Sequence, residues 1–219
     1  MSVKNKSAPD HVQDSINLLR KVYPDAHCEL LFKNPFELLC ATILSAQCTD
    51  ERVNKVTPAL FKKFPTPAKM ANASVDEIEA FIKSVNFFRN KARALKECSA
   101  VLVEKHGGKV PQTLEELVAL RGVGRKTANV VLGNSFGVPS LVVDTHVGRL
   151  ARRLGWTKKT DPVEVEKDLM NKVVREEWSM LSHFLIFHGR RRCKARNPDC
   201  ENCEIATFCP SFPLKVAKK

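Results

Sequence analysis

Residues 120–126 have the sequence Leu-Arg-Gly-Val-Gly-Arg-Lys, and they decide how the middle of this chain is expected to fold. Gly122 and Gly124 allow a tight turn that side chains would block. Apolar residues at helical spacing predict one helix before this turn, over residues 113–120, and another after it, over residues 125–135. The sequence therefore predicts two helices joined by a glycine hairpin.

The start of the second helix carries the chemistry of this unit. The first backbone N–H groups of a helix have no partner within it, and the positive end of the helix dipole lies there, so this terminus suits a phosphate. Lys126 lies in the first turn, next to Arg125. A lysine is a poor nucleophile while protonated, and neighbouring positive charge disfavours the ammonium form. Lys126 is therefore a candidate nucleophile, with a solvated surface lysine as the alternative.

Asp144 follows in the sequence Val143-Asp-Thr-His146, directly before another helical pattern. Aspartate is a common residue at the start of a helix, so a role as a cap alone is one interpretation. Taken singly, each feature favours its structural interpretation, but the glycine turn, the lysine and the aspartate are not expected together in this order by chance.

Residues 120–132 and 143–146 resemble the helix-hairpin-helix and the following Gly/Pro–Asp motif of the endonuclease III family of DNA glycosylases. In that family the lysine is the nucleophile and the aspartate assists it, and the matching residues here are Lys126 and Asp144. Arg121 stands where the family commonly has proline, which removes some rigidity from the turn and offers a further phosphate contact. The resemblance also implies that the hairpin binds the DNA backbone through Gly122, Gly124 and Arg125.

Four of the eight cysteines lie near the C-terminus, in the pattern C-x6-C-x2-C-x5-C. Thiolates bind both structural zinc and iron–sulfur clusters, and the spacing alone leaves both possible. A disulfide framework is not expected, because nothing indicates an oxidising compartment. The spacing matches the [4Fe–4S] loop of the endonuclease III family, which implies a cluster with a mainly structural role. Its ligands would be Cys193, Cys200, Cys203 and Cys209.

Further DNA contacts are expected from three segments. Lys194 and Arg196 lie in the cysteine loop, where they either contact phosphate or form a solvated charge run. Gln47 matches the family glutamine that enters the space left by an extruded base, although it is equally well a polar helix end. Phe87 matches the family residue, usually leucine, that wedges into the duplex, whereas a core position for Phe87 or Phe88 is the alternative.

Composition agrees with a DNA-binding protein. The formal net charge of +12 indicates a polyanionic partner, with nucleic acid as the first candidate. The N-terminal Met-Ser-Val-Lys-Asn-Lys has no apolar signal core, and no segment has the length of a transmembrane helix. We therefore expect an intracellular protein that binds no membrane. The resemblance implies a cytoplasmic, nucleoid-associated monomer that binds damaged double-stranded DNA.

The pattern is helical throughout, which predicts an all-α protein. The resemblance implies two helical domains flanking a DNA-binding cleft, with Lys126 and Asp144 facing each other across it. One domain spans residues 28–138 and contains the hairpin, and the other joins residues 1–27 to 139–219 and holds the cluster loop. Helices are expected at 10–22, 35–46, 50–64, 74–83, 88–106, 113–120, 125–135, 145–154, 162–173 and 177–188.

The resemblance implies a base-excision repair enzyme that flips a damaged nucleotide out of the duplex. The neutral amine of Lys126 would attack C1′ and displace the base, while Asp144 would deprotonate the lysine and stabilise the cationic sugar. The resulting Schiff base would allow β-elimination 3′ to the abasic site. Oxidised or ring-saturated pyrimidines and abasic sites would be the substrates.

Three other functions share many of these features. A monofunctional adenine glycosylase has the hairpin, the aspartate and the cluster, but no Schiff-base lysine at the position of Lys126. A thymine-mismatch glycosylase has a similar length, but typically carries tyrosine at that position. A non-catalytic iron–sulfur protein that binds DNA would be distinguished only by its lack of activity.

Overall fold

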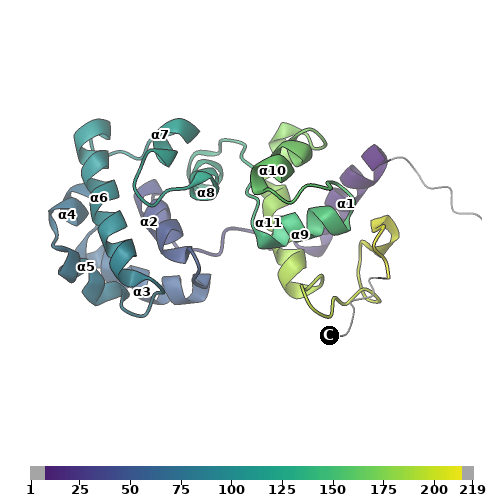
Figure 1. Ribbon diagram of the computed structural model, residues 1–219, viewed down its shortest axis with the longest axis horizontal. Helices are drawn as coiled ribbons and strands as arrows, with labels where there is room; N and C mark the ends of the chain where they lie inside the picture. The colour runs from purple at the N-terminus through teal and green to yellow at the C-terminus, as the bar shows by residue number, and fades with distance from the viewer. Residues whose placement is uncertain (1–7, 214–219) are drawn as a thin grey trace, which may run out of the picture. The chain divides into compact units, whose positions relative to one another are not determined.

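The computed structural model describes residues 8–213, and these residues form α-helices and short 3-10 helices without a β-strand (Figure 1). The predicted all-α class is therefore confirmed. The N-terminal hexapeptide considered above lies outside the described residues. The chain divides into two compact units, one of residues 28–138 and one that combines the chain up to His27 with the chain from Pro139 onward.

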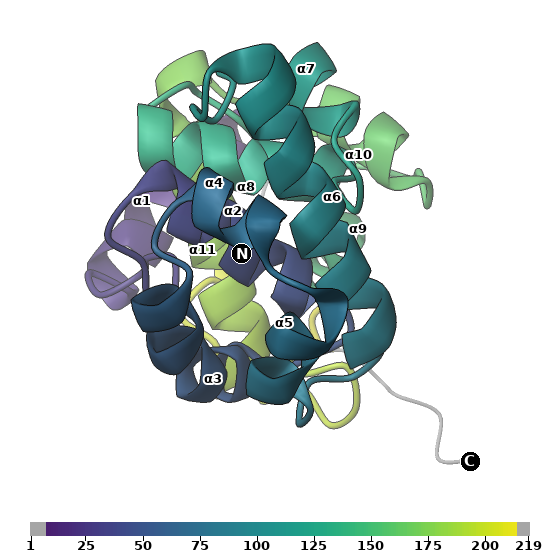
Figure 2. The same ribbon diagram turned by 90° about the vertical axis from the view of Figure 1, so that its left-hand side faces the viewer.

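The unit of residues 28–138 is built around α6, the longest of its helices, which packs against α4 and α5, while α2 packs against α8 (Figure 2). Leu39, Leu60, Ile78 and Leu95 are fully buried in its core. Its helices are α2 (Pro35–Ser45), α3 (Asp50–Lys63), α4 (Pro67–Asn72), α5 (Val75–Ile82), α6 (Phe88–His106), α7 (Leu114–Val118) and α8 (Arg125–Phe136).

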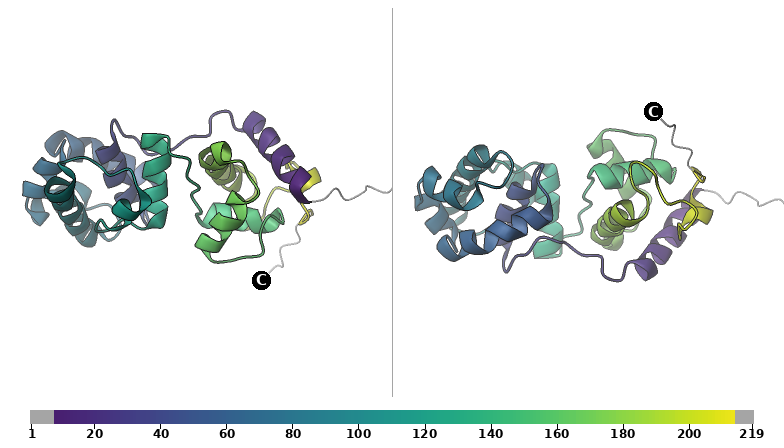
Figure 3. Two further views of the ribbon diagram at one scale, coloured as in Figure 1. Left: turned by 90° about the horizontal axis from the view of Figure 1, so that it is seen from above. Right: turned by 90° about the horizontal axis from the view of Figure 1, so that it is seen from below.

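The other unit draws its core from both ends of the chain. Ile16 of the first helix is fully buried in the same apolar cluster as Val147, Val165 and Leu181. Figure 3 accordingly shows the purple α1 beside the green α11, and the two helices are in contact. Its elements are α1 (Ala8–Val22), α9 (Thr145–Arg153), α10 (Pro162–Met170), η1 (Arg175–Glu177), α11 (Trp178–Arg191) and η2 (Ala206–Phe208).

Local capping explains where most helices begin and end. Ser74 and Glu77 form the capping box that their spacing in the sequence predicts, and Pro35 and Pro162 occupy first-turn positions. Gly107 ends α6 with φ +57°, a left-handed conformation that glycine adopts without a steric penalty. The ten predicted helices are all present within a few residues of their expected limits.

Two local features differ from the sequence analysis. The six-residue α4 was not expected, because so short a helix shows no clear apolar periodicity; Thr66 caps it and Pro67 starts it. The spacing of Thr113 and Glu116 in the sequence predicts a capping box, and the hydroxyl of Thr113 does accept a hydrogen bond from the backbone N–H of Glu116. The Glu116 carboxylate, however, accepts from the Thr113 hydroxyl at 2.6 Å. In a reciprocal capping box the carboxylate accepts a hydrogen bond from the backbone N–H of the capping residue instead. Here it bonds to the side chain of Thr113, so the box is not reciprocal.

Candidate active site and cluster loop

The hairpin turn depends on Gly122. Its φ is +80°, and a Cβ at this position would lie 2.9 Å from Cβ of Ala94 on α6. The turn therefore needs glycine both for its backbone conformation and for its close approach to α6. Gly124 precedes α8 in an extended conformation and has no side chain to cap it. Gly124 therefore does not cap the first-turn N–H groups of α8. An anion-binding site at a helix start needs such N–H groups as donors.

Lys126 is the second residue of α8, and its side chain is exposed, as is that of Arg125. A large partner therefore has access to both. Arg121, at the position of the family proline, lies 3.6 Å from the Glu97 carboxylate of α6, measured from its Nε. Both of these side chains are largely exposed, so this ion pair contributes little to stability.

Asp144 is held by interactions on both sides. Its Oδ1 accepts hydrogen bonds from the backbone N–H groups of His146, at 2.8 Å, and Val147, at 2.9 Å, so the predicted cap is present. The backbone N–H of Val142, two residues earlier, donates to Ser182 Oγ on α11 at 2.8 Å. The segment before α9 is thus fixed to α11. The two capping bonds use one carboxylate oxygen and leave Oδ2 outside them.

The four C-terminal cysteines line one cavity, all as partly buried free thiols. Among residues 8–213, no three His, Cys, Asp or Glu side chains are arranged to hold a single metal ion. Four thiols that line one cavity suit a cluster that takes one ligand from each of four cysteines. Burial raises the pKa of Cys203 to about 11, so binding as thiolate must release protons.

Two family models match this chain. Residues 40–175 match the HhH-GPD superfamily of base excision DNA repair proteins, and residues 193–209, bounded by Cys193 and Cys209, match the iron–sulfur binding domain of endonuclease III. Endonuclease III of Synechocystis sp. is 49% identical over 209 residues, which cover 95% of each chain. The enzyme of Bacillus subtilis is 47% identical over 199 residues, or 90% of this chain and 91% of the relative.

This chain belongs to the endonuclease III family.

A solved endonuclease III, in a trapped covalent intermediate with DNA, matches with a TM-score of 0.89 and 46% identity, over 94% of this chain and 97% of the other. A thermostable thymine-DNA glycosylase matches with a TM-score of 0.86 but only 20% identity, which shows the shared fold alone. As a member of the endonuclease III family, the protein is a base excision repair DNA glycosylase with a [4Fe–4S] cluster.

Two arginines of α9 hold the cluster loop, residues 193–209, and the sequence analysis missed both. Arg153 Nη1 donates to Cys193 Sγ at 3.2 Å and to the Lys194 carbonyl at 2.8 Å. Arg149 Nη2 donates to the carbonyls of Gly189 and Cys193, each at 3.0 Å. Their spacing of four residues on one helix places them on the same face, which is the sequence signal that a common partner would leave.

Arg149 also links this loop to the start of α9. Its Nη2 lies 3.1 Å from Nδ1 of His146, the residue two positions after Asp144. A Cβ on Gly189 would lie 2.9 Å from that same ring nitrogen, so glycine is required where α11 passes the histidine. His146 therefore takes part in the packing around the start of α9.

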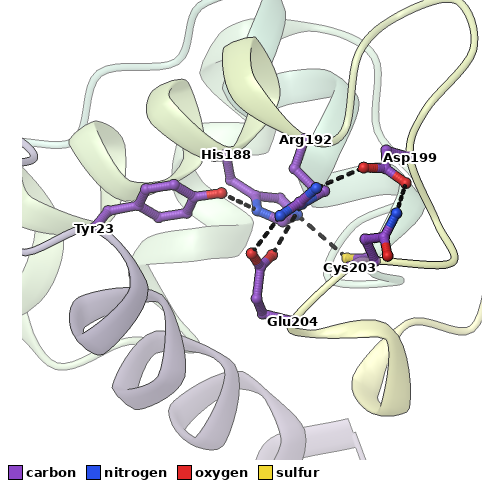
Figure 4. Close-up of polar contacts among 7 residues, drawn as sticks. Tyr23, His188, Arg192, Asp199, Cys203 and Glu204 are labelled. Carbon is purple, nitrogen blue, oxygen red and sulfur yellow. Dashed lines mark hydrogen bonds and ion pairs between the residues drawn. The ribbon is translucent and has the colours of Figure 1, made fainter.

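His188 on α11 connects the core to a predicted cluster ligand (Figure 4). It is 1% exposed, and burial lowers its pKa to about 4, so the ring is neutral near pH 7. Nδ1 lies 2.9 Å from the Tyr23 hydroxyl, and Nε2 lies 3.6 Å from Cys203 Sγ. A hydroxyl that donates to Nδ1 leaves the ring proton on Nε2, where it faces the sulfur. This network fixes the orientation of the imidazole.

The arginines that precede Cys193 have structural partners. Arg192 bridges Asp199 and Glu204 at 2.5 and 2.8 Å, which closes the cysteine loop on itself (Figure 4). Arg191 pairs with Asp25 at 2.6 Å, and its guanidinium lies 4.5 Å from the centre of the Phe187 ring. The side chains of Lys194 and Arg196, in contrast, are exposed.

The remaining residues predicted to touch DNA lie in the unit of residues 28–138. Phe87 is 61% exposed, whereas the neighbouring Phe88 packs against the core. Gln47 is also exposed. Together with Asn197, Gln47 and Phe87 are the non-glycine residues with positive φ in the described part of the chain. Cys40 and Cys98 lie in apolar helical patterns of the sequence, which predict core positions, and both are buried in the core. No helix in the described region is long and apolar enough to span a membrane.

Proposed function

We propose that this DNA glycosylase removes oxidised pyrimidines from duplex DNA and then cleaves the strand 3′ to the abasic site. The observation that carries the proposal is the exposed amine of Lys126, one residue into a helix whose N-terminus has no side-chain cap from Gly124. This placement offers a phosphate site and a nucleophile side by side. A glycosylase that uses only water would not need the amine.

The reaction begins with a nucleotide extruded from the base stack, which costs a few kcal/mol and less at a damaged base. The neutral amine of Lys126 attacks C1′, and the bond between C1′ and the base breaks with its electron pair on the departing base. Asp144 accepts a proton from the lysine ammonium and stabilises positive charge on the sugar. Its Oδ2 stands outside the two capping bonds and is the oxygen assigned to this role.

Opening of the sugar ring gives a Schiff base between Lys126 and C1′. This imine acidifies the proton on C2′. Loss of that proton expels the 3′ phosphate, so the strand breaks by β-elimination. Hydrolysis of the imine returns the free amine of Lys126. The product is a strand break with no net oxidation or reduction.

DNA binding is assigned to the basic and glycine-rich surface elements. The hairpin with Gly122, Gly124 and Arg125 holds the backbone through N–H groups and positive charge. Lys194 and Arg196 add phosphate contacts from the cluster loop, where both are exposed. We assign the four cysteines as the ligands of the cluster. The cluster supplies structural cross-linking of a loop that contributes little apolar core of its own.

Borohydride trapping tests the proposal. The holoprotein is mixed with duplex DNA that contains one ring-saturated pyrimidine, and the imine is reduced with borohydride. A covalent protein–DNA complex is expected with borohydride, and a 3′ strand break is expected in a parallel reaction without it. Base release without a covalent complex would instead indicate a monofunctional glycosylase, and binding without base release would indicate a non-catalytic protein.

A further inference from the structure

Lys91 is a buried lysine whose ammonium holds the end of another helix. It is 6% exposed, and its Nζ donates to the carbonyl of Leu44 at 2.8 Å and to that of Ala46 at 2.6 Å. Both carbonyls lie at the C-terminal end of α2. A positive charge is favourable there, because the negative end of the helix dipole and unpaired carbonyls meet at that terminus.

Asn86 adds a third hydrogen bond to the same loop. Its Nδ2 donates to the backbone carbonyl of Gln47 at 2.7 Å. The carbonyls of Ala46 and Gln47, which are consecutive, are therefore both held by the segment that contains Phe87. Asn86 precedes Phe87 directly, and Lys91 follows it in the first turn of α6.

The two residues held in this way share an unusual conformation. Gln47 has φ +53° and Phe87 has φ +58°. Both values lie in the left-handed region, which residues other than glycine rarely adopt. Such a conformation persists only where the surrounding structure fixes it, and it is concentrated at functional sites. Both side chains are exposed, so packing of the side chains themselves does not explain why the backbone is held so firmly.

We propose that Asn86 and Lys91 are positioning residues that join Gln47 and Phe87 into one rigid element, which enters duplex DNA where a nucleotide has been extruded. The inference rests on the proposed function, and on the expectation from the family resemblance that Gln47 and Phe87 enter the duplex. A glutamine and a phenylalanine on independent loops would each lose conformational freedom on insertion. Two side chains fixed beforehand avoid that loss, so extrusion becomes more favourable.

A double-mutant cycle tests whether Asn86 acts through Gln47. Single-turnover base release is measured for Asn86→Ala, Gln47→Ala and the double variant, on duplex and on single-stranded DNA with the same lesion. Asn86→Ala should slow release from duplex by about tenfold, which is below the roughly hundredfold loss that a 1 Å misplacement can cause. Release from the single strand should change little, because no stack has to be held open. In the Gln47→Ala background, Asn86→Ala should have a smaller effect, because only the placement of Phe87 is left to lose.

Lys96 provides a matched control for Lys91. It lies on the same helix, and its Nζ likewise donates to two backbone carbonyls, those of Ala71 and Ala73 at the end of α4. Lys91→Met and Lys96→Met should therefore lower the melting temperature to a similar degree. Only Lys91→Met should lower the ratio of duplex to single-strand rates.

Hydrogen exchange tests, without using activity, whether Asn86 and Lys91 hold the loop that contains Gln47. Amide exchange should accelerate over residues 45–49 in Lys91→Met and Asn86→Ala, and over residues 71–74 in Lys96→Met. Unchanged exchange over 45–49, or additive effects of Asn86→Ala and Gln47→Ala on the duplex rate, would overturn the proposal. If the wild-type protein releases no base, the proposed function is wrong. The exchange experiment would still decide whether Asn86 and Lys91 hold the loop that contains Gln47.

Discussion

Oδ1 of Asp144 lies 2.9 Å from the backbone nitrogen of Val147, and this hydrogen bond starts α9. The same oxygen accepts from His146 at 2.8 Å. One carboxylate oxygen therefore serves the fold while the other stands outside these bonds. This arrangement lets the structural and the proposed catalytic roles of Asp144 be separated by substitution.

Asp144→Asn should keep the helix cap and lose most of the base-release activity. An amide oxygen can accept both backbone bonds, but an amide neither accepts the lysine proton nor offsets a cationic sugar. Asp144→Ala should lose the cap as well, at a cost of about 1 kcal/mol in unfolding free energy. Urea unfolding measures the first effect and single-turnover base release the second. Equal, minor losses of base release in both variants would restrict Asp144 to capping.

Lys126→Gln should abolish strand cleavage and borohydride trapping while it keeps most DNA affinity. The side chain is exposed, so stability should change by no more than about 0.5 kcal/mol. Arg125→Gln, at the preceding position, removes the same charge and is the control: it should weaken binding and retain trapping. A trapped complex formed by Lys126→Gln at the normal rate would identify another amine as the nucleophile.

Arg153→Met should loosen the cluster loop. The substitution removes bonds to Cys193 Sγ and to the carbonyls of Lys194 and Ala195. Purified protein should be brown with about four irons per chain, and Arg153→Met should lose its visible absorption faster under chelator. Arg152→Met, at the exposed neighbouring position, should behave as wild type, and Cys200→Ser should lack the colour. A colourless wild type with one zinc would contradict the cluster assignment.

Lys194→Ala should weaken binding to damaged and undamaged duplex alike. Loss of one phosphate contact should reduce the slope of log K against log[salt] by about 0.9. Arg191→Ala removes an arginine that is already paired with Asp25, so its salt slope should stay close to that of wild type. Binding isotherms at several salt concentrations make the comparison. A slope unchanged by Lys194→Ala would remove this lysine from the DNA contacts.

Gly122→Ala should destabilise the hairpin more than a backbone effect alone explains. The left-handed conformation costs a non-glycine residue about 1–2 kcal/mol, and the new Cβ would meet Cβ of Ala94 at 2.9 Å. Gly137→Ala is the control, because its φ is +64° but nothing lies within 4 Å of the added Cβ. Urea midpoints compare the two variants. Equal shifts would show that α6 moves away without cost.

The sequence by itself determined the features that depend on neighbours along the chain. The glycine hairpin, the lysine after it and the spacing of the last four cysteines are local patterns, and the resemblance to a family rests on them. Capping residues such as Ser74 and Asp144 act on N–H groups two or three positions away, so they mark helix starts without any knowledge of packing. Helix limits were accordingly predictable within a few residues, except for the short α4.

Only the tertiary structure decided which distant residues serve the site. The contacts of Arg153 with the cluster loop, of Tyr23 with His188 and of Asn86 with Gln47 join segments separated by dozens of residues or more. Each of these side chains has an ordinary surface or core pattern in the sequence. The packing of the helices around two apolar cores determines which partners these side chains meet. That packing depends on the shapes of many side chains at once.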